Sequence, residues 1–465
     1  MTAALGFEAY RQRIAAALAG GGRFADLHAT SDGSLVRTLL TEASGAPTLH
    51  TVATEGGVAP SIVDLAPAAG WDEREAHDLQ GVRFAGHEPL RPLVDHDTEG
   101  ERWVRLHGDD AYQVAVGPIH AGVIESGHFR FHLVGDLILH VDAQLFYKHR
   151  GLERAAEAKT LREGLGYAAR ACAACAVTNG VAYAHACEEA LGLVPTAELA
   201  RARTILLELE RTWSHLNDIA AACAGVGLAG GNNSFAALTE RARRLNARLT
   251  GHRFLFGCVE VGGSALSLGA EDVRAAREEI AALAAESARS WRELLFNASF
   301  QDRLPDIGVV DAGDAERLGA VGPAARAAGI AEDVRAASPR LAYAGFDPIV
   351  PKRAAGDVRA RVEQRALELL QTFAALDELL DRPVGPASAQ PGGEEGPIGI
   401  ARVESPRGGT SCVVERRGDR IERLRLRTGS YANWPAVAFA AAGNLLPDFP
   451  LINKSFELCY ACADR

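Results

Sequence analysis

The chain has 465 residues with a formal net charge of -11 at pH 7, and 48% of its residues are apolar. This length allows two or three domains with a core that needs no disulfide bonds, and the acidic balance excludes a basic face, so we expect no nucleic-acid partner. Charged residues interrupt the apolar stretches before the roughly 18 residues that cross a bilayer, which predicts a chain without a membrane span.

The N-terminal region has the pattern of a small α+β domain. An amphipathic helical stretch comes first, and the β-type runs Leu49 to Ala53 and Ser61 to Leu65 follow it. The region ends with Trp71-Asp-Glu-Arg-Glu-Ala-His-Asp-Leu-Gln-Gly-Val-Arg-Phe-Ala-Gly-His-Glu-Pro-Leu-Arg91, which closely resembles a signature of the thirty-kilodalton subunit of respiratory complex I. We therefore predict a domain like that subunit over residues 1–98 and a linker over residues 99–116.

The rest of the chain is predicted as a large, mostly helical domain flanked by β-structure, over residues 117–465. Residues 129–140 alternate as in an antiparallel hairpin with Gly135-Asp136 as its turn. Residues 154–300 repeat apolar side chains every three or four positions, as packed helices do, for example in 200–222. Later elements are a helix in 356–381, a Pro- and Gly-rich loop over 383–397, the β-type runs Thr410 to Glu415 and Arg420 to Arg427, and an Ala-rich helix. The predicted fold class is α+β.

The eight cysteines fall into two groups. Four stand singly in apolar or Ala-rich surroundings and are interpreted as core residues, namely Cys187, Cys223, Cys258 and Cys412. The other four form two remote C-x-x-C pairs, Cys172 with Cys175 and Cys459 with Cys462. Each C-x-x-C places two sulfurs on one side of a turn, and two pairs supply the four thiolates that soft metals prefer.

Three kinds of site compete for these pairs. A structural zinc site usually draws its ligands from a short ribbon, and a thioredoxin-like redox couple needs one C-x-x-C beside a βαβ unit. A catalytic metal held between distant parts of a large domain fits the wide separation best. We therefore predict that Cys172, Cys175, Cys459 and Cys462 are metal ligands.

The surroundings of both pairs resemble those in the large subunit of nickel-iron hydrogenases, most of all the energy-converting, complex I-like group. The first pair lies in Arg170-Ala-Cys-Ala-Ala-Cys-Ala-Val-Thr-Asn179 and the second in Cys459-Tyr-Ala-Cys-Ala-Asp-Arg465. The resemblance implies that all four thiolates bind nickel. It also implies that Cys175 and Cys462 bridge to an iron with diatomic ligands, while Cys172 and Cys459 are terminal.

Further motifs extend the resemblance along most of the chain. Glu125 lies near the place of the family's proton-relay glutamate, and His120 and His128 correspond to the loop that approaches quinone in the homologous large subunit of complex I. His149-Arg-Gly-Leu-Glu153 resembles the family's H-R-G-x-E, and Glu404-Ser-Pro-Arg-Gly408 resembles its A-P-R-G, whose arginine, Arg407 here, lies over the metals. The implied catalytic residues are Arg407, Glu125 and Cys459, and the implied cofactor-binding residues are His120 and His128.

The chain departs from the hydrogenase pattern beside the ligands. Ala169, Ala173 and Asn179 stand where the family has Glu, Gly and His, and Glu457-Leu458 replaces Asp-Pro before the second pair. Such positions orient or tune metal ligands. Asn179 agrees with complex I, so the sequence combines hydrogenase thiolates with some surroundings of the quinone-reducing type.

The resemblance implies an oxidoreductase that reduces protons or oxidises dihydrogen at a nickel-iron centre, as a peripheral subunit at the cytoplasmic face of the cell membrane. An iron-sulfur cluster in a small subunit, like the twenty-kilodalton subunit of complex I, would exchange the electrons, with a ferredoxin-like subunit and membrane subunits as further partners. Two alternatives stay open. One is a quinone-site subunit of an NADH:quinone oxidoreductase without metal, and the other is a scaffold subunit without catalysis.

Overall fold

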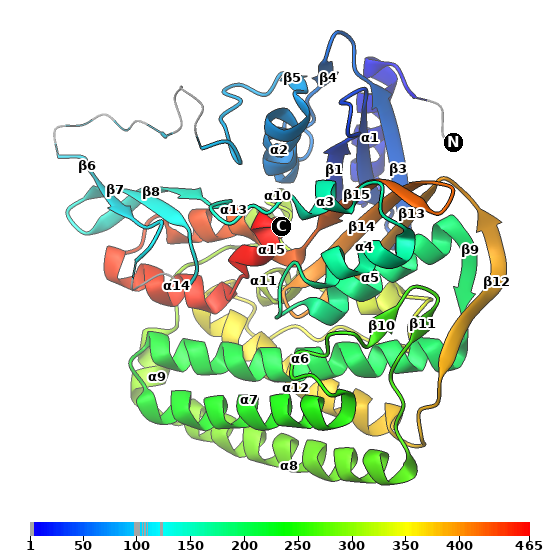
Figure 1. Cartoon of the computed structure of the whole chain (residues 1–465). Helices are drawn as coiled ribbons and strands as arrows, with labels where there is room; N and C mark the ends of the chain where they lie inside the picture. Colours follow the sequence, from blue (N-terminus) through cyan, green and yellow to red (C-terminus); the bar gives the residue numbers. More distant parts are fainter. Residues whose placement is uncertain (1–3, 97–102, 105, 107, 109, 121–123) are drawn as a thin grey trace.

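The structure is a computed structural model that describes residues 4–96, 103, 104, 106, 108, 110–120 and 124–465. Figure 1 shows an N-terminal domain, a small hairpin sheet beside it, and a large domain with a bundle of long helices. The predicted linker over 99–116 lies partly outside the described residues, and its last residues, Tyr112–Val116, form strand β6.

The N-terminal domain is a three-stranded antiparallel sheet with helices beside it. Helix α1 (Phe7–Ala19) buries Tyr10 and Ile14, which lie four residues apart on one face. Helix α2 (Gly70–Gln80) ends at Gly81, whose positive φ forms a left-handed C-cap. The other elements are β1 (Arg23–Ala29), β2 (Leu35–Thr41), β3 (Pro47–Ala53), β4 (Val58–Pro60), the 3₁₀ helix η1 (Pro67–Ala69) and β5 (Arg83–Ala85).

One predicted strand of this domain is wrong, because Ser61 to Leu65 form no strand but include a turn. The Glu73 carboxylate accepts two hydrogen bonds from this segment. Glu73 accepts hydrogen bonds from the Ile62 backbone N–H at 2.8 Å and from the Ser61 hydroxyl at 2.9 Å. The other predicted run, Leu49 to Ala53, is confirmed within β3.

A second antiparallel sheet has the order β6–β7–β8. Strands β7 (His128–Val134) and β8 (Leu137–Gln144) pair across Gly135 and Asp136, which confirms the predicted hairpin and its turn. Phe129 and Phe131 of β7 are buried on one face, where both rings contact Phe449. The hairpin is thereby fixed to the C-terminal helices.

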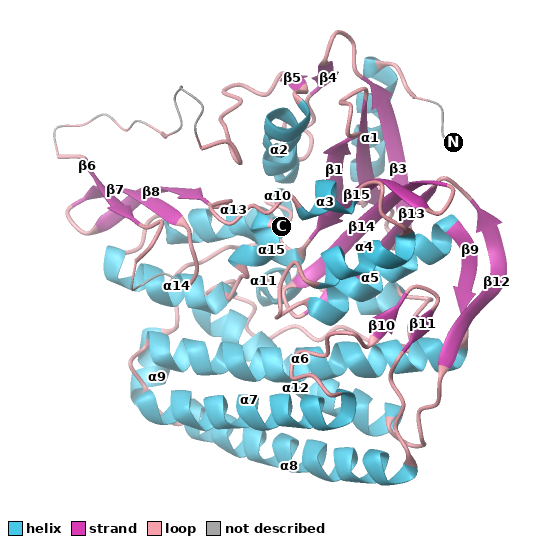
Figure 2. Ribbon diagram, viewed as in Figure 1, coloured by secondary structure: helices cyan, strands magenta, loops and turns pink. Residues whose placement is uncertain are grey.

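Long helices pack side by side in a bundle (Figures 1 and 2). Helix α6 (Ala197–Gly225) contains the predicted helix 200–222, and the Thr196 hydroxyl caps it by accepting a hydrogen bond from the Leu199 N–H. It packs against α7 (Ala229–Thr250) and α12 (Val358–Leu379), and α8 (Ala270–Leu295) packs against both of those. The shorter helices are α3 (Leu152–Ala156), α4 (Leu161–Ala169), α5 (Ala176–Ala190), α9 (Ala298–Arg303), α10 (Ala312–Arg317), α11 (Gly322–Ala327) and η2 (Val334–Ala337).

A central antiparallel sheet joins the two domains. It consists of β13 (Ile398–Ser405), β14 (Gly408–Arg417) and β15 (Arg420–Arg427), and the last two confirm the predicted β-type runs. Helix α5 packs against β13 and β14. On the N-terminal side, Val413 packs with Ala25 and Leu39 of the N-terminal sheet. The domains therefore meet sheet to sheet.

The prediction of a loop over 383–397 is wrong, because this segment contains strand β12 (Ala387–Glu395). This strand pairs antiparallel with β9 (Leu191–Pro195) and with β11 (Gly263–Ser264), which in turn pairs with β10 (Val259–Glu260). The side chains of β12 are mostly exposed, so main-chain hydrogen bonds hold the strand in place. Its sequence therefore lacks the alternation of apolar and polar residues that predicts a strand.

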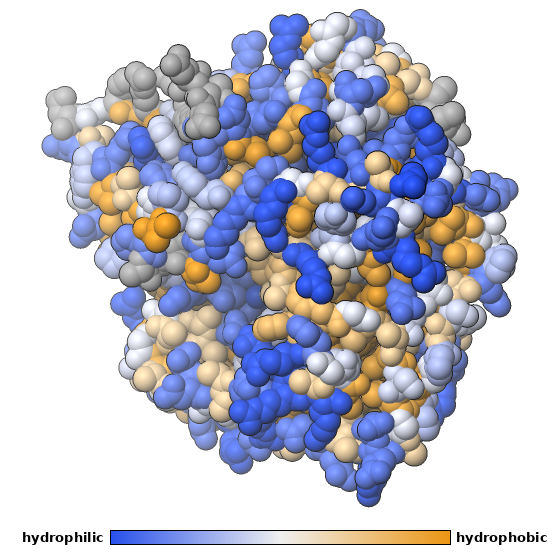
Figure 3. All heavy atoms as spheres, viewed as in Figure 1, coloured by the Kyte–Doolittle hydropathy of each residue, from blue (hydrophilic) through white to orange (hydrophobic). Residues whose placement is uncertain are grey.

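The C-terminal segment folds back into the middle of the molecule (Figure 1). It contains α13 (Gly429–Ala441), which confirms the predicted Ala-rich helix, then η3 (Leu446–Asp448), α14 (Phe449–Phe456) and α15 (Tyr460–Asp464). No helix among the described residues has the length and apolar character of a membrane span. Figure 3 shows hydrophilic side chains over much of one face, with smaller apolar patches between them.

Candidate metal centre

Two loops that are remote in the sequence bring the paired cysteines together. Cys172 and Cys175 lie between α4 and α5, and Cys459 and Cys462 lie at the start of α15 and within it. Their Sγ atoms all lie within 4.8 Å of one another. The structure thus places in one cluster the four sulfurs that the sequence predicts as metal ligands.

The sulfur cluster is largely closed to solvent. Cys172, Cys175 and Cys462 are buried and Cys459 is half-buried. Hydrogen bonds from the other three cysteines, and the Arg407 guanidinium, lower the pKa of the Cys459 thiol well below its ordinary value. Contact with Cys172 and the other sulfurs, together with burial, raises the pKa of Cys175. Four adjacent thiolates repel one another, so a cation is needed before all four can ionise.

The segment before α3 fastens the two cysteine loops to each other. The Arg150 guanidinium donates to the Ala171 carbonyl at 2.7 Å and to the Ala461 carbonyl at 3.4 Å. These carbonyls precede one cysteine of each pair. Asp464 accepts two backbone N–H bonds from the same segment at 2.7 and 2.9 Å. The motif His149 to Glu153 therefore helps to hold the two cysteine pairs next to each other.

Arg407 lies beside the sulfurs, in the tight turn between β13 and β14. Its guanidinium donates to the Glu457 carbonyl and to the Asp218 carboxylate, each at 2.9 Å, and to the Ser214 hydroxyl. Burial alone would lower the pKa of Arg407, but Asp218 and then the charge of Cys459 raise it. Arg407 therefore presents a fixed positive charge to the cluster.

Glu125 reaches the second cysteine pair from the loop before β7. Its carboxylate accepts a hydrogen bond from the Ala461 backbone N–H at 2.9 Å, between Cys459 and Cys462. Burial, and then the negative charge of Cys459, raise the pKa of Glu125 above its ordinary value. A half-buried carboxyl of this kind can exchange a proton with a neighbouring thiolate.

The two predicted histidines have different surroundings. His128 is buried at the start of β7, where its Nδ1 lies 3.2 Å from the Gly117 carbonyl oxygen and its ring lies 5.0 Å from that of Trp103. Burial lowers the pKa of His128, which favours the neutral imidazole. His120 is exposed. The two rings therefore differ in their access to solvent.

Two residues that orient Arg407, Asp218 and Ser214, were not found from the sequence. Both lie on α6, where they resemble ordinary polar positions of an amphipathic helix. The available signal was a charged stripe on α6, because Glu208, Arg211, His215 and Asp218 recur every three or four residues and buried charges need partners. Asn179, noted in the sequence as a departure, directs its amide nitrogen to the Cys462 Sγ at 3.9 Å.

The single cysteines lie elsewhere, as predicted. Cys187, Cys223, Cys258 and Cys412 are buried in the main hydrophobic core and are not part of the sulfur cluster.

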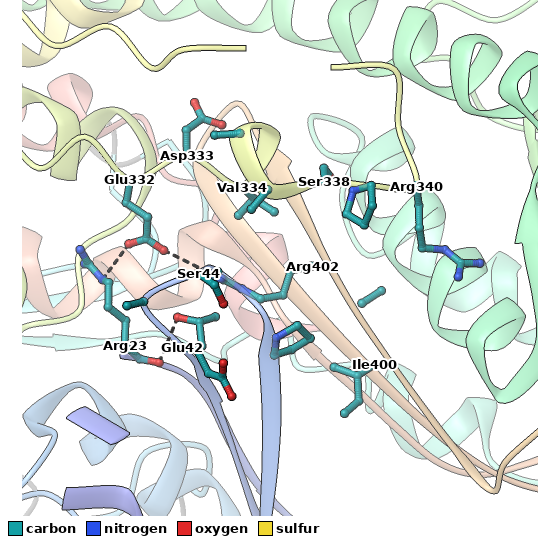
Figure 4. Close-up of a pocket in the computed structure, with 18 of the residues that line it drawn as sticks. Arg23, Glu42, Ser44, Glu332, Asp333, Val334, Ser338, Arg340, Ile400 and Arg402 are labelled. Carbon is teal, nitrogen blue, oxygen red and sulfur yellow. Dashed lines mark hydrogen bonds and ion pairs between the residues drawn. The ribbon is translucent and has the colours of Figure 1, made fainter. Parts of the chain in front are cut away.

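A cleft of about 770 Å³ opens where the loop after β2 faces residues 330–340 and β13 (Figure 4). Glu332 in its lining contacts Arg23 at 2.7 Å and Arg402 at 3.3 Å. None of the described residues that line this cleft is a cysteine. The thiolate donor set is therefore separate from the open cleft between the domains.

The sequence of this chain is similar to known protein families and to individual proteins. The families described as respiratory-chain NADH dehydrogenase, 49 Kd subunit, and respiratory-chain NADH dehydrogenase, 30 Kd subunit, match residues 232–391 and 31–103. Formate hydrogenlyase subunit 5 of Escherichia coli is 31% identical over 442 residues, which cover 87% of this chain and 77% of that protein. Membrane-bound hydrogenase subunit alpha of Pyrococcus furiosus is 29% identical over 399 residues, with 78% and 88% covered.

A solved structure is similar over most of the chain. It belongs to the membrane-bound sulfane sulfur reductase, an archaeal respiratory membrane complex, and one of its chains matches with a TM-score of 0.70 and 28% identity. The match covers 77% of this chain and 99% of that chain.

Proposed function

This chain belongs to the family of large subunits shared by membrane-bound hydrogenases and respiratory NADH dehydrogenase, and on this premise we propose that it is the catalytic large subunit of a nickel-iron hydrogenase. The observation that carries the proposal is the buried group of four sulfurs within 4.8 Å of one another. The proposed reaction is the oxidation of dihydrogen to two protons and two electrons, or its reverse.

The donor set fits the proposed centre. Soft thiolates suit nickel and iron, and a cation offsets the repulsion among them. A set of four cysteines also suits zinc, but a structural zinc site has no need of the buried guanidinium and the half-buried carboxyl beside these sulfurs. Cys172, Cys175, Cys459 and Cys462 would together hold the nickel-iron centre.

When bound, the nickel-iron centre supplies the Lewis acid and the redox chemistry for heterolytic cleavage of dihydrogen. The protein's own residues manage charge and protons around it. Arg407 supplies a fixed positive charge beside the sulfurs. The Cys459 sulfur is the proposed first proton acceptor, and Glu125, bonded to the peptide N–H of Ala461, passes the proton toward the surface.

The electrons need an outlet, because the described residues form no second cluster of cysteines. We propose an iron-sulfur small subunit, similar to the twenty-kilodalton subunit of complex I, as the partner that carries the next redox group. A ferredoxin-like subunit and membrane subunits would complete a complex I-like assembly at the cytoplasmic face of the membrane.

Dihydrogen uptake by the purified complex, measured with an artificial electron acceptor, tests this function. Cys462→Ala should abolish uptake, a loss beyond the roughly 10–100-fold that follows removal of a residue supporting a metal ligand. Cys187→Ala removes a buried sulfur outside the cluster and should keep the activity. Unchanged uptake in Cys462→Ala would remove the metal hypothesis.

A quinone-site role is the second candidate, because both matched families are subunits of NADH dehydrogenase. In that role His120 and His128 would approach the quinone, and the sulfurs would hold no nickel. Quinone-dependent turnover of a nickel-free complex would support it. The absence of both activities would leave a scaffold subunit.

A further inference from the structure

The Arg465 side chain lies at the boundary of the two domains, three residues after Cys462. It is 2% exposed. One guanidinium nitrogen donates to both carboxylate oxygens of Glu75, at 2.7 and 2.6 Å. The other donates to Glu153 at 3.1 Å and to the Leu426 carbonyl at 2.6 Å. One guanidinium nitrogen thus serves both Glu75 oxygens, and the contact is charge-assisted and excluded from water, which strengthens such a pair.

Glu75 comes from the N-terminal domain. It lies on α2, at the end of the Trp71-Asp-Glu-Arg-Glu75 run, whose role the proposed function leaves unexplained. The same carboxylate accepts from Arg425 of β15 at 2.7 Å. Burial would raise the pKa of Glu75, but Arg425 and Arg465 hold it at about 2, so the carboxylate is ionised at neutral pH.

A single helical turn connects this ion pair to the sulfurs. The Arg465 backbone N–H bonds to the Ala461 carbonyl at 3.1 Å, and the Thr428 hydroxyl bonds to the Cys462 carbonyl at 3.1 Å. Arg465 therefore belongs to the same hydrogen-bonded turn as Cys462, which connects its guanidinium contacts to the second cysteine pair. Besides the Arg150 contact shared with the second pair, the first cysteine pair has a support of its own, because Glu210 of α6 accepts hydrogen bonds from the Val177 and Thr178 backbone N–H groups at the start of α5.

We propose that Glu75 is a positioning residue, through which the N-terminal domain sets the second cysteine pair at the distance from the first pair that metal binding requires. The inference rests on the proposed function, since it needs the four sulfurs to bind a metal. It assigns to the N-terminal domain a part in forming the metal centre, beyond holding subunits together.

Cobalt binding to the full chain, prepared without nickel, tests this role. Co²⁺ alone is titrated into the protein, and the sulfur-to-cobalt charge-transfer absorption reports coordination by several thiolates. Glu75→Gln should weaken cobalt affinity on the order of 10–100-fold and reduce the band at saturation. Arg465→Met should do the same, and Arg465→Lys, which keeps the charge, should restore part of the affinity.

Glu415→Gln is the matched control. It breaks another buried ion pair between the domains, in which Arg37 donates to Glu415 at 2.7 and 2.6 Å, but it does not touch residues 459–465. Its cobalt affinity and spectrum should equal those of the unaltered chain. Hydrogen exchange of amides 460–465 should accelerate in Glu75→Gln and Arg465→Met but not in Glu415→Gln.

The outcomes separate the two levels of the proposal. If the unaltered chain shows no thiolate-to-cobalt band, the metal site itself, and with it the proposed function, fails. If that chain binds cobalt and Glu75→Gln binds equally well, or if Glu415→Gln weakens binding as much, the positioning role is overturned. Should Glu75→Gln not fold, the comparison of Arg465→Lys with Arg465→Met decides in the same way.

Discussion

Buried ion pairs connect the N-terminal sheet to the central sheet. Asp26 of β1 pairs with Arg425 at 2.8 Å, and Arg37 of β2 pairs with Glu415. These four side chains are buried. Because each charge has a partner, the interior holds no isolated charge at these positions, and removal of one partner would create one.

The Arg37–Glu415 pair predicts a specific dependence of stability on pH. Burial would raise the pKa of Glu415, but His28 and Arg37 lower it from 4.5 to about 2. A lowered pKa in the folded state adds stability above the unfolded value, and this contribution is lost as the pH falls from about 4.5 toward 2. The free energy of unfolding of the unaltered chain should therefore exceed that of Glu415→Gln by about 3 kcal/mol at pH 6.

Urea unfolding of both proteins between pH 6 and about pH 3 measures this difference. The gap should shrink on acidification, because below about pH 4.5 the Glu415 carboxyl of the unfolded chain takes up a proton while that of the folded chain stays ionised. A gap that stays constant or widens toward low pH would show that Glu415 is not held ionised by its partners.

Some residues of the candidate site could be predicted from the sequence, and others could not. The four cysteines could be predicted because each C-x-x-C is a local pattern. Arg407 and Glu125 came from motifs that resemble a known family. Asp218 could not be predicted, because its partner Arg407 lies 189 residues away and a polar residue on a long helix resembles a solvated one.

At the scale of elements, the approach of α5 to β13 positions the first cysteine pair. Helix α5 begins at Ala176, directly after Cys175. A Cβ atom on Gly399 of β13 would lie 1.9 Å from the Ala186 carbonyl oxygen, so a residue other than glycine would push the helix off the sheet.

Gly399→Ala should therefore lower the free energy of unfolding by about 3 kcal/mol, the upper part of the usual range for overpacking. The matched variant is Gly396→Ala, whose added Cβ would meet its nearest atom at 3.8 Å. That change should stay within about 0.5 kcal/mol. Superimposable urea curves for the two variants would contradict the close packing of α5 on β13.

Elements with strong periodicity were predictable, and elements held by main-chain pairing were not. The helical stripes of α6 and α12 and the hairpin of β7 and β8 were found from their patterns. Strand β12 was missed, because its exposed side chains carry no alternation. The segment from Ser61 to Leu65 has strand-like composition, but the Glu73 carboxylate accepts hydrogen bonds from the Ile62 N–H and the Ser61 hydroxyl, and the chain turns over residues 63–65.

For the whole molecule, the α+β fold class is confirmed by the similar solved structure. The arrangement of the two domains could not be predicted from the sequence, because the residues that join them lie far apart along the chain. Asp26 and Arg425, for example, are 399 residues apart. Helix α2 of the N-terminal domain, strand β15 and the C-terminal turn meet around Arg465, three residues after Cys462, so the proposed metal site depends on the assembled chain.

The metal content of the purified complex tests most directly the claim that two remote cysteine pairs hold one bimetallic centre. We expect a single nickel ion per chain, together with infrared bands from diatomic ligands on iron, and the loss of both in Cys462→Ala. Stoichiometric zinc in place of nickel, or nickel that persists in Cys462→Ala, would contradict the account.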